Sequence, residues 1–308
     1  MERRRIGSLE VSVVGLGCNN FGGRLDEGRT RAVVDAAIDA GITLFDTADN
    51  YGSTLSEEFL GRILEGRRDR VVLATKFGGW REDLGREGGA SPAYVREAVE
   101  ASLRRLRTDR IDLYQLHSPD AETPVAETLG ALDELVREGK VREVGCSNFT
   151  AAMLREADEA ARAAGRARFA SVQNELSLLA TDDAPEGLAE AARLSMAYLP
   201  YFPLASGLLT GKFHRGEPPP EGTRVAGWSE ERLDAQLTDA TWSRIEALTR
   251  FAEERGRSLL ELAFAWLLAN EPVASVIAGA TSPEQVRANA GAGAGAWRPG
   301  ESEFADLG

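Results

Sequence analysis

Short apolar runs alternate with longer stretches of helical period along this chain, and the alternation repeats eight times. The strand-like runs are residues 11–17, 42–46, 70–76, 110–117, 141–147, 169–175, 196–204 and 273–279. The helix-like stretches are residues 30–40, 56–64, 92–106, 124–138, 151–163, 186–193, 239–255 with 259–269, and a last one from Ser282. Eight strands that are each followed by a helix predict a (β/α)8 TIM barrel. We expect residues 1–308 to form one such domain; the alternative, an open doubly wound sheet, lacks a GxGxxG after its first strand.

Three segments fall outside this repeat. RRRIGSLEVSV at the N-terminus predicts a β-hairpin around Gly7 and Ser8, which would plug the bottom of the barrel. The connection after the seventh strand, from Ser206 to about Thr238, is long, and such loops are usually functional or disordered. GAGAGAW, residues 291–297, is low in complexity and is expected to be a flexible linker or a turn.

The charge balance narrows the class of partner. Lys and Arg number 36 against 49 Asp and Glu, a net charge of -13, which argues against nucleic acid or an anionic membrane as the main partner. The two cysteines, Cys18 and Cys146, form no CxxC, which favours a reducing, cytoplasmic compartment. The longest apolar run, residues 259–269, is too short to cross a bilayer. We therefore expect a cytoplasmic protein whose main partner is neither nucleic acid nor a membrane.

Titratable side chains stand where three consecutive predicted strands end. Asp46 ends residues 42–46, Lys76 ends residues 70–76, His117 ends residues 110–117, and Tyr51 lies in the loop after Asp46. Alone, each has an ordinary structural explanation: a turn cap, a loop aromatic, a solvated charge or a structural histidine. TIM barrels place their active sites at this end of the strands, so the sequence predicts that the four side chains converge.

Their chemistry is complementary. A tyrosine hydroxyl has an ordinary pKa of about 10, and a nearby ammonium such as that of Lys76 stabilises the phenolate and lowers this pKa. The carboxylate of Asp46 would hold the ammonium in place, and a neutral His117 would hydrogen-bond a substrate oxygen. Tyr51 is therefore predicted to be a general acid for an oxygen that gains negative charge.

Several segments, in their order and spacing, resemble the aldo-keto reductase family over nearly the whole chain: GLGCNNFG (15–22), FDTADNYG (45–52), SEEFLGRIL (56–64), VVLATKFG (71–78), SLRRLRTDRIDLYQLHSPD (102–120), LVREGKVREVGCSNF (135–149), VQNELSLL (172–179), YFPLASGLLTGK (201–212) and SVIAGATSPEQVRAN (275–289). The resemblance implies hydride transfer between a nicotinamide cofactor and the carbonyl of an aldehyde or ketone, without a metal. The family's catalytic tetrad falls on Asp46, Tyr51, Lys76 and His117.

The resemblance also implies a cofactor site. Ser147, Asn148 and Gln173 would hold the nicotinamide carboxamide, which needs donors and acceptors, and Tyr201 would stack on the ring. The remaining positions would bind the pyrophosphate (Leu204, Ser206, Gly207, Leu208 and Lys212) and the adenosine half (Gly279, Thr281, Gln285 and Asn289).

The resemblance is less clear about the 2′-phosphate, the group that distinguishes NADPH from NADH. Many NADPH-preferring relatives carry a cation in the last segment, where this chain has Arg287 nearby. NADP(H) is the default on family grounds, and NAD(H) is the alternative. Phe21, Trp80 and Trp228 are candidates for an apolar substrate pocket.

A second function stays open at this point. Some relatives with the same fold are cofactor-binding regulatory subunits with little turnover, and such proteins can retain the tetrad. We therefore keep two hypotheses, a carbonyl-reducing oxidoreductase and a regulatory subunit. The substrate, an aldehyde, a ketone or the corresponding alcohol, is not specified further.

Overall fold

Eight parallel strands form a ring, in the order β11-β10-β9-β8-β5-β4-β3-β12. This computed structural model describes residues 1–81, 86–87, 89–182, 184–295 and 297. The strands of the ring are β3 (Val14–Gly17), β4 (Leu44–Asp46), β5 (Val72–Phe77), β8 (Ile111–Leu116), β9 (Val141–Ser147), β10 (Ser171–Glu175), β11 (Ala197–Tyr201) and β12 (Val276–Gly279). A parallel bridge between Tyr198 and Val273 joins β11 to the residues before β12. The predicted (β/α)8 barrel is confirmed.

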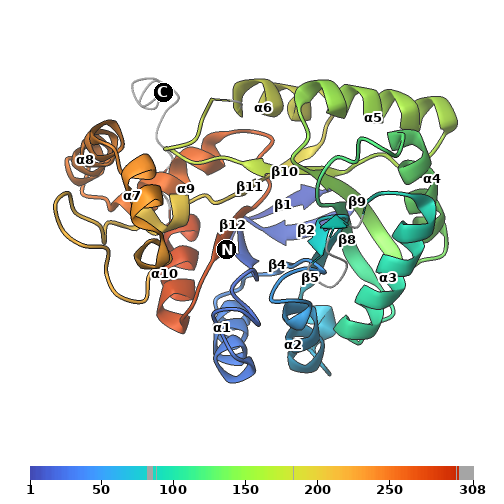
Figure 1. Ribbon diagram of the computed structural model, residues 1–308, viewed down its shortest axis with the longest axis horizontal. Coiled ribbons are helices and arrows are strands. Elements are labelled where there is room, and N and C mark those ends of the chain that lie inside the picture. The colour runs from blue at the N-terminus through green and yellow to red at the C-terminus, as the bar shows by residue number, and fades with distance from the viewer. Residues whose placement is uncertain (82–85, 88, 183, 296, 298–308) are drawn as a thin grey trace.

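Helices surround the ring on its outer side (Figure 1). They are α1 (Glu27–Asp39), α2 (Leu55–Ile63), α3 (Pro92–Leu106), α4 (Val125–Arg137), α5 (Ala151–Ala164), α6 (Ala184–Arg193), α8 (Asp239–Glu253), α9 (Leu259–Ala269) and α10 (Pro283–Ala294). Several begin where a side-chain oxygen accepts a backbone N–H of the first turn, as Asp26 does for α1 and Ser258 for α9. Ser282, where the last helix was expected to start, caps α10 by accepting the N–H of Gln285.

The N-terminal hairpin is present as predicted and consists of β1 (Arg3–Ile6) and β2 (Leu9–Ser12). Its turn contains Gly7 at φ 55°, in the left-handed region. Ile6, Leu9 and Val11 are buried in one cluster with inward-facing barrel residues such as Leu113. The hairpin therefore closes one end of the barrel. The single strand expected over residues 11–17 is split between β2 and β3.

The connection after β11 is not structureless. It contains two short 3-10 segments, η2 (Ala205–Thr210) and η3 (Val225–Gly227), and then α7 (Glu230–Gln236). A small hairpin that was not predicted, β6 (Trp80–Arg81) with β7 (Arg86–Glu87), follows β5, and another 3-10 segment, η1 (Arg68–Arg70), precedes it.

The expected flexible linker at residues 291–297 is wrong for its first residues. Helix α10 continues to Ala294, and Gly293 packs so closely that a Cβ there would lie 2.1 Å from Val14 Cγ2. The small residues therefore allow α10 to approach β3 rather than to form a linker. Ala296 lies outside the described residues.

In the part of the chain that the structure describes, no helix combines the length and the apolar character that a bilayer crossing requires.

Candidate active site

The carboxyl ends of β4, β5 and β8 bring the four predicted side chains together. Asp46 is the last residue of β4, Lys76 is next to last in β5, and His117 directly follows β8. Tyr51 returns over the barrel from the loop after β4. The loop can do so because Gly52, at φ 56°, lies against another loop: a Cβ there would be 2.4 Å from the carbonyl oxygen of Phe21.

Lys76 is the centre of this arrangement. Its side chain is completely buried. Its Nζ atom donates to Asp46 Oδ2 at 2.6 Å, to the carbonyl oxygen of Thr47 at 2.9 Å and to Tyr51 Oη at 3.3 Å. An ammonium has three N–H donors. All three are used here, and one of them is directed at the tyrosine hydroxyl.

Burial and charge oppose one another in this cluster. Burial alone would lower the pKa of Lys76, but the charges and hydrogen bonds of Asp46 and Tyr51 outweigh it, and the pKa of Lys76 is raised. Burial raises the pKa of Tyr51, and the Lys76 ammonium lowers it only in part. The net shift of Tyr51 is thus opposite to the sequence expectation. At neutral pH Tyr51 carries its proton and Lys76 its charge.

His117 faces Tyr51 edge-on, with ring centroids 5.9 Å apart. Burial, and the nearby Lys76 charge, lower the pKa of His117 from 6.5 to about 3. The imidazole is therefore neutral at physiological pH. Its buried Nδ1 atom has no hydrogen-bond partner among the described residues, which leaves Nε2 as the nitrogen available to a ligand in the cavity.

The low pKa of His117 predicts a dependence of stability on pH. Below pH 6.5 the unfolded chain binds a proton at His117 that the folded protein does not bind. The free energy of unfolding therefore falls as the pH falls toward 3, by up to about 1.4 kcal/mol per pH unit. In His117→Gln this contribution disappears. Between pH 6.5 and 4.5 the variant should lose about 2 kcal/mol less free energy of unfolding than the wild type, measured by urea denaturation. If the variant and the wild type lost the same free energy of unfolding over this range, His117 would be protonated in the folded protein.

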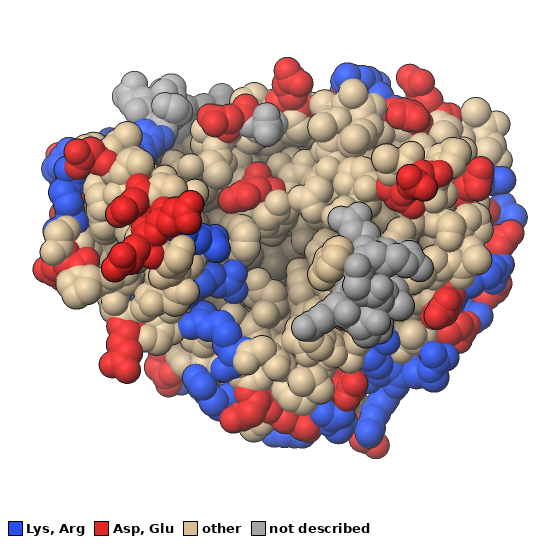
Figure 2. Space-filling model, viewed as in Figure 1, with Lys and Arg blue, Asp and Glu red and all other residues tan. Residues whose placement is uncertain are grey.

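A cavity of about 1030 Å³ opens beside these residues. Figure 2 shows the hollow at the centre of this face, with Lys and Arg side chains gathered along one of its sides. Asp46, Tyr51 and His117 line it, whereas Lys76 lies behind them. Most of the predicted cofactor residues line it too: Ser147, Asn148, Gln173, Tyr201, Leu204, Ser206, Gly207, Lys212, Gly279, Thr281, Gln285 and Asn289. Leu208 instead lines a neighbouring cavity.

The residues predicted for the nicotinamide end are linked to one another. Tyr201 Oη donates to Asn148 Oδ1 at 2.9 Å, and Asn148 Nδ2 donates to the carbonyl oxygen of His117 at 2.9 Å. Ser147 Oγ donates to the carbonyl oxygen of Gln173 at 2.7 Å. The amide of Gln173 is directed into the barrel, where Nε2 donates to Asp46 Oδ1 at 3.0 Å. Its Oε1 atom and the second N–H of its amide remain for a ligand.

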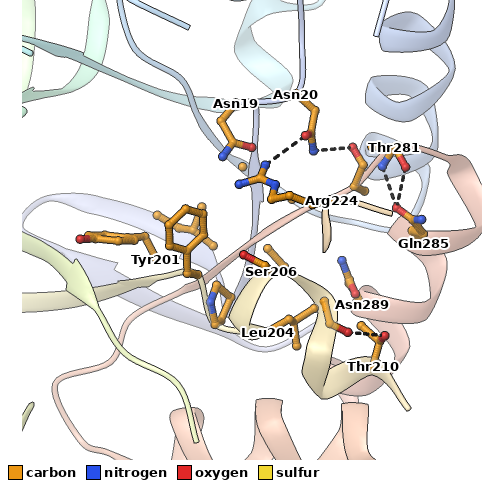
Figure 3. Close-up of a pocket in the computed structure, with 18 of the residues that line it drawn as sticks. Asn19, Asn20, Tyr201, Leu204, Ser206, Thr210, Arg224, Thr281, Gln285 and Asn289 are labelled. Atoms are coloured by element: carbon orange, nitrogen blue, oxygen red, sulfur yellow. Dashed lines mark hydrogen bonds between the residues drawn. The ribbon is translucent and has the colours of Figure 1, made fainter. Parts of the chain in front are cut away.

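The opposite end of the cavity is built from small residues and a helix start. Ser206 and Gly207 have left-handed φ angles of 59° and 104°. The first turn of α10 contributes Gln285, whose Oε1 accepts the backbone N–H of Thr281 at 2.7 Å (Figure 3). Backbone N–H groups at such turns and helix starts bind anions well. This end can therefore hold phosphate groups.

Sequence reasoning missed the half-buried cation of the cavity, Arg224. In Figure 3 its side chain crosses the space between Asn20 and Ser206. Its Nη2 donates to Asn20 Oδ1 at 3.2 Å, and Arg24 also lines the cavity. No described carboxylate lies within salt-bridge distance of either arginine. Arg287, the cation noted nearby in the sequence, does not line the cavity and pairs with Glu284 at 3.3 Å.

The aromatic residues expected in a substrate pocket lie elsewhere. Phe21 is completely buried in the core, and Trp80 is 58% exposed. Trp228 lines the neighbouring cavity, with the guanidinium of Arg232 4.4 Å from its ring centroid. Phe202, at 39% exposure, is the aromatic residue beside Tyr201 that does line the main cavity.

Among the described residues, no three His, Cys, Asp or Glu side chains converge as a metal site would require. Both cysteines are free and buried. Cys18 lines the cavity near Asp46, and burial raises its pKa well above 9.0, which makes it a poor nucleophile. Three residues of the predicted tetrad, Asp46, Tyr51 and His117, line the cavity, as do Glu221 and Glu284.

Comparison with known proteins finds relatives in both sequence and structure. A sequence model of the Aldo/keto reductase family matches residues 13–297. The uncharacterized oxidoreductase YqkF of Bacillus subtilis (strain 168) is 36% identical over 297 residues, which cover 94% of this chain and 90% of that protein. The holo form of aldo-keto reductase AKR11C1 from Bacillus halodurans has a TM-score of 0.80 and 35% identity, and the match covers 100% of this chain and 95% of that chain.

Proposed function

Because the chain belongs to the aldo/keto reductase family, we propose that it transfers a hydride between NAD(P)H and the carbonyl of an aldehyde or ketone, with Tyr51 as proton donor. Membership makes it an oxidoreductase of a family that uses nicotinamide cofactors. One observation supports the proposal that Tyr51 donates the proton. The hydroxyl of Tyr51 lies at the wall of a large cavity, 3.3 Å from a buried ammonium that is itself paired with Asp46.

The protonation states suit carbonyl reduction. Tyr51 is protonated at neutral pH because burial raises its pKa, so it can give a proton to the oxygen that gains negative charge. The resulting tyrosinate would lie beside the Lys76 ammonium, which stabilises it electrostatically. Neutral His117 can donate one hydrogen bond to the same oxygen and thereby orient the carbonyl.

The lining residues fit a nicotinamide dinucleotide. The cofactor, when bound, supplies or accepts the hydride. Asn148 and the side-chain amide of Gln173 would hold the carboxamide, and the partly buried ring of Tyr201 offers a stacking surface. Ser206, Gly207 and Lys212 would hold the pyrophosphate, and Thr281, Gln285 and Asn289 the adenosine half.

We propose NADPH rather than NADH as the cofactor. Arg24, Arg224 and Lys212 all line the cavity, and none has a carboxylate partner among the described residues. On a protein of net charge -13, a cavity with three such cations favours the more anionic of the two dinucleotides. Comparing the Kd values of NADPH and NADH tests this; tighter binding of NADH would contradict it.

Replacing Arg224 is expected to weaken cofactor binding. A hydrogen bond to a charged group contributes about 1.5–3 kcal/mol, so Arg224→Met should raise the Kd of NADPH by about 10-fold to 100-fold. Arg287→Met is the matched control, because Arg287 is exposed and outside the cavity. Fluorescence titration measures both. Equal Kd values for the two variants would remove Arg224 from the cofactor site.

The proposed reaction is tested with a panel of aldehydes, ketones and sugars, each offered with NADPH and with NADH. The nicotinamide absorbance should fall with a carbonyl substrate, and one alcohol should form per cofactor consumed. Stable cofactor binding without turnover on any member of the panel would instead favour the regulatory-subunit hypothesis.

A further inference from the structure

Asp46 has a second set of partners on the side that faces away from Lys76. Its Oδ2 atom accepts from Lys76, while Oδ1 accepts from Gln115 Nε2 at 3.2 Å and from Gln173 Nε2 at 3.0 Å. Asp46 is only 3% exposed. Both oxygens of a buried carboxylate are therefore satisfied, one by an ammonium and the other by two neutral amides.

Gln115 reaches Asp46 from inside the barrel. It lies on β8, where its register partners are Lys76 on β5 and Gly145 on β9. It is completely buried and, unlike Gln173, does not line the cavity. A Cβ at Gly145 would come within 3.1 Å of Gln115 Cγ, so the glycine leaves the room that this side chain occupies. Gln115 can influence the reaction only through the groups that it touches.

Burial of the Gln115 amide is energetically unfavourable in part. The Oε1 atom of Gln115 has no hydrogen-bond partner among the described residues, and an unsatisfied buried acceptor is unfavourable. An apolar residue such as Leu113, two positions earlier on the same face, would avoid this cost. Among the described residues, the side chain of Gln115 makes one hydrogen bond, to Asp46.

We propose that Gln115 is a positioning residue that keeps Asp46 anionic and thereby keeps the Lys76 ammonium charged beside Tyr51. In a buried pair the proton of the ammonium can pass to the carboxylate, which leaves a neutral amine and a neutral acid. Two amide donors on Oδ1 favour the carboxylate. Without the Gln115 donor the charged pair is less favoured, and the tyrosinate formed in the reaction loses part of its stabilisation.

The inference rests on the proposed function, and its test separates the two. Gln115→Met keeps the approximate volume and removes the donor. It should lower kcat by about tenfold, equivalent to about 1.4 kcal/mol, and leave the Kd of NADPH unchanged, because position 115 lies outside the cavity. Leu113→Met is the matched control on the same strand and should keep the wild-type kcat.

The pH profile distinguishes positioning from a merely structural role. The titratable groups that face the Asp46–Lys76 pair are Cys18 at the β3 end, Tyr51 in the β4–α2 loop and His117 at the β8 end. Arg224, from the long loop, interacts with Tyr51. A less favoured ion pair gives up its proton more readily. The alkaline limb of kcat in Gln115→Met should therefore lie about one pH unit lower than in the wild type.

A second variant keeps the inference testable if Gln115→Met does not fold. The protonated carboxyl of Gln115→Glu can donate to Asp46 as the amide does, whereas the ionised form places a second anion there. Its kcat should fall with rising pH along a limb that the wild type lacks. The inference is overturned if Gln115→Met keeps the kcat and the alkaline limb of the wild type. It is also overturned if Gln115→Glu shows no new limb. Absence of wild-type turnover on the carbonyl panel would instead overturn the proposed function.

Discussion

Tyr51→Phe is expected to lower kcat by about 10²–10⁴-fold, because general acid catalysis contributes about that much. The substitution removes one hydroxyl and retains the ring. The cofactor should bind with nearly its wild-type Kd, since the hydroxyl contacts Lys76 and not the residues proposed to hold the dinucleotide. Steady-state kinetics with a carbonyl substrate and fluorescence titration of NADPH measure the two effects separately.

Tyr114→Phe is the matched control for this result. Tyr114 is a completely buried tyrosine on β8 that does not line the cavity, and its hydroxyl has no partner among the described residues. Its removal should leave kcat unchanged. Comparable rates in Tyr51→Phe and the wild type would show that another group donates the proton.

Lys76→Met is expected to affect both rate and stability. The variant leaves the buried carboxylate of Asp46 without its cation, and breaking a buried ion pair in this way costs about 3–5 kcal/mol. It also removes the charge that stabilises the tyrosinate, so kcat should fall by about 10²-fold or more. Urea denaturation measures the free energy of unfolding, and steady-state kinetics measure kcat.

The double variant Asp46→Asn with Lys76→Met separates these two effects. It has no buried charge to desolvate, so it should recover most of the lost free energy of unfolding while kcat stays low. If the double variant regained activity together with stability, the ammonium of Lys76 would have only a structural role.

The sequence was most informative at the strand ends. Alternating apolar runs locate where each strand stops, and parallel strands bring their carboxyl ends to one rim, so Asp46, Lys76 and His117 could be assigned to one site. The helices were located well because caps such as Ser282 act locally. These features depend on a few neighbouring residues and on the repeat of the fold.

The features that the sequence did not reveal depend on contacts between segments that are distant in the chain. Arg224 lies in a connection without periodicity, and its bond to Asn20 joins residues 204 positions apart. Gln115 was visible only as part of a strand, since its role depends on Asp46, which is 69 positions away. The direction of the Tyr51 pKa was mispredicted because burial, which the sequence does not display, outweighs the nearby ammonium.

The most direct test of Tyr51 as proton donor follows NADPH absorbance under single-turnover conditions with a reducible aldehyde or ketone, in the wild type and in Tyr51→Phe. The proposed reaction should consume one cofactor per alcohol formed in the wild type, and should consume it much more slowly in the variant from the same bound complex. Equal rates in the two proteins, or a cofactor that stays reduced in the wild type with every carbonyl offered, would contradict it.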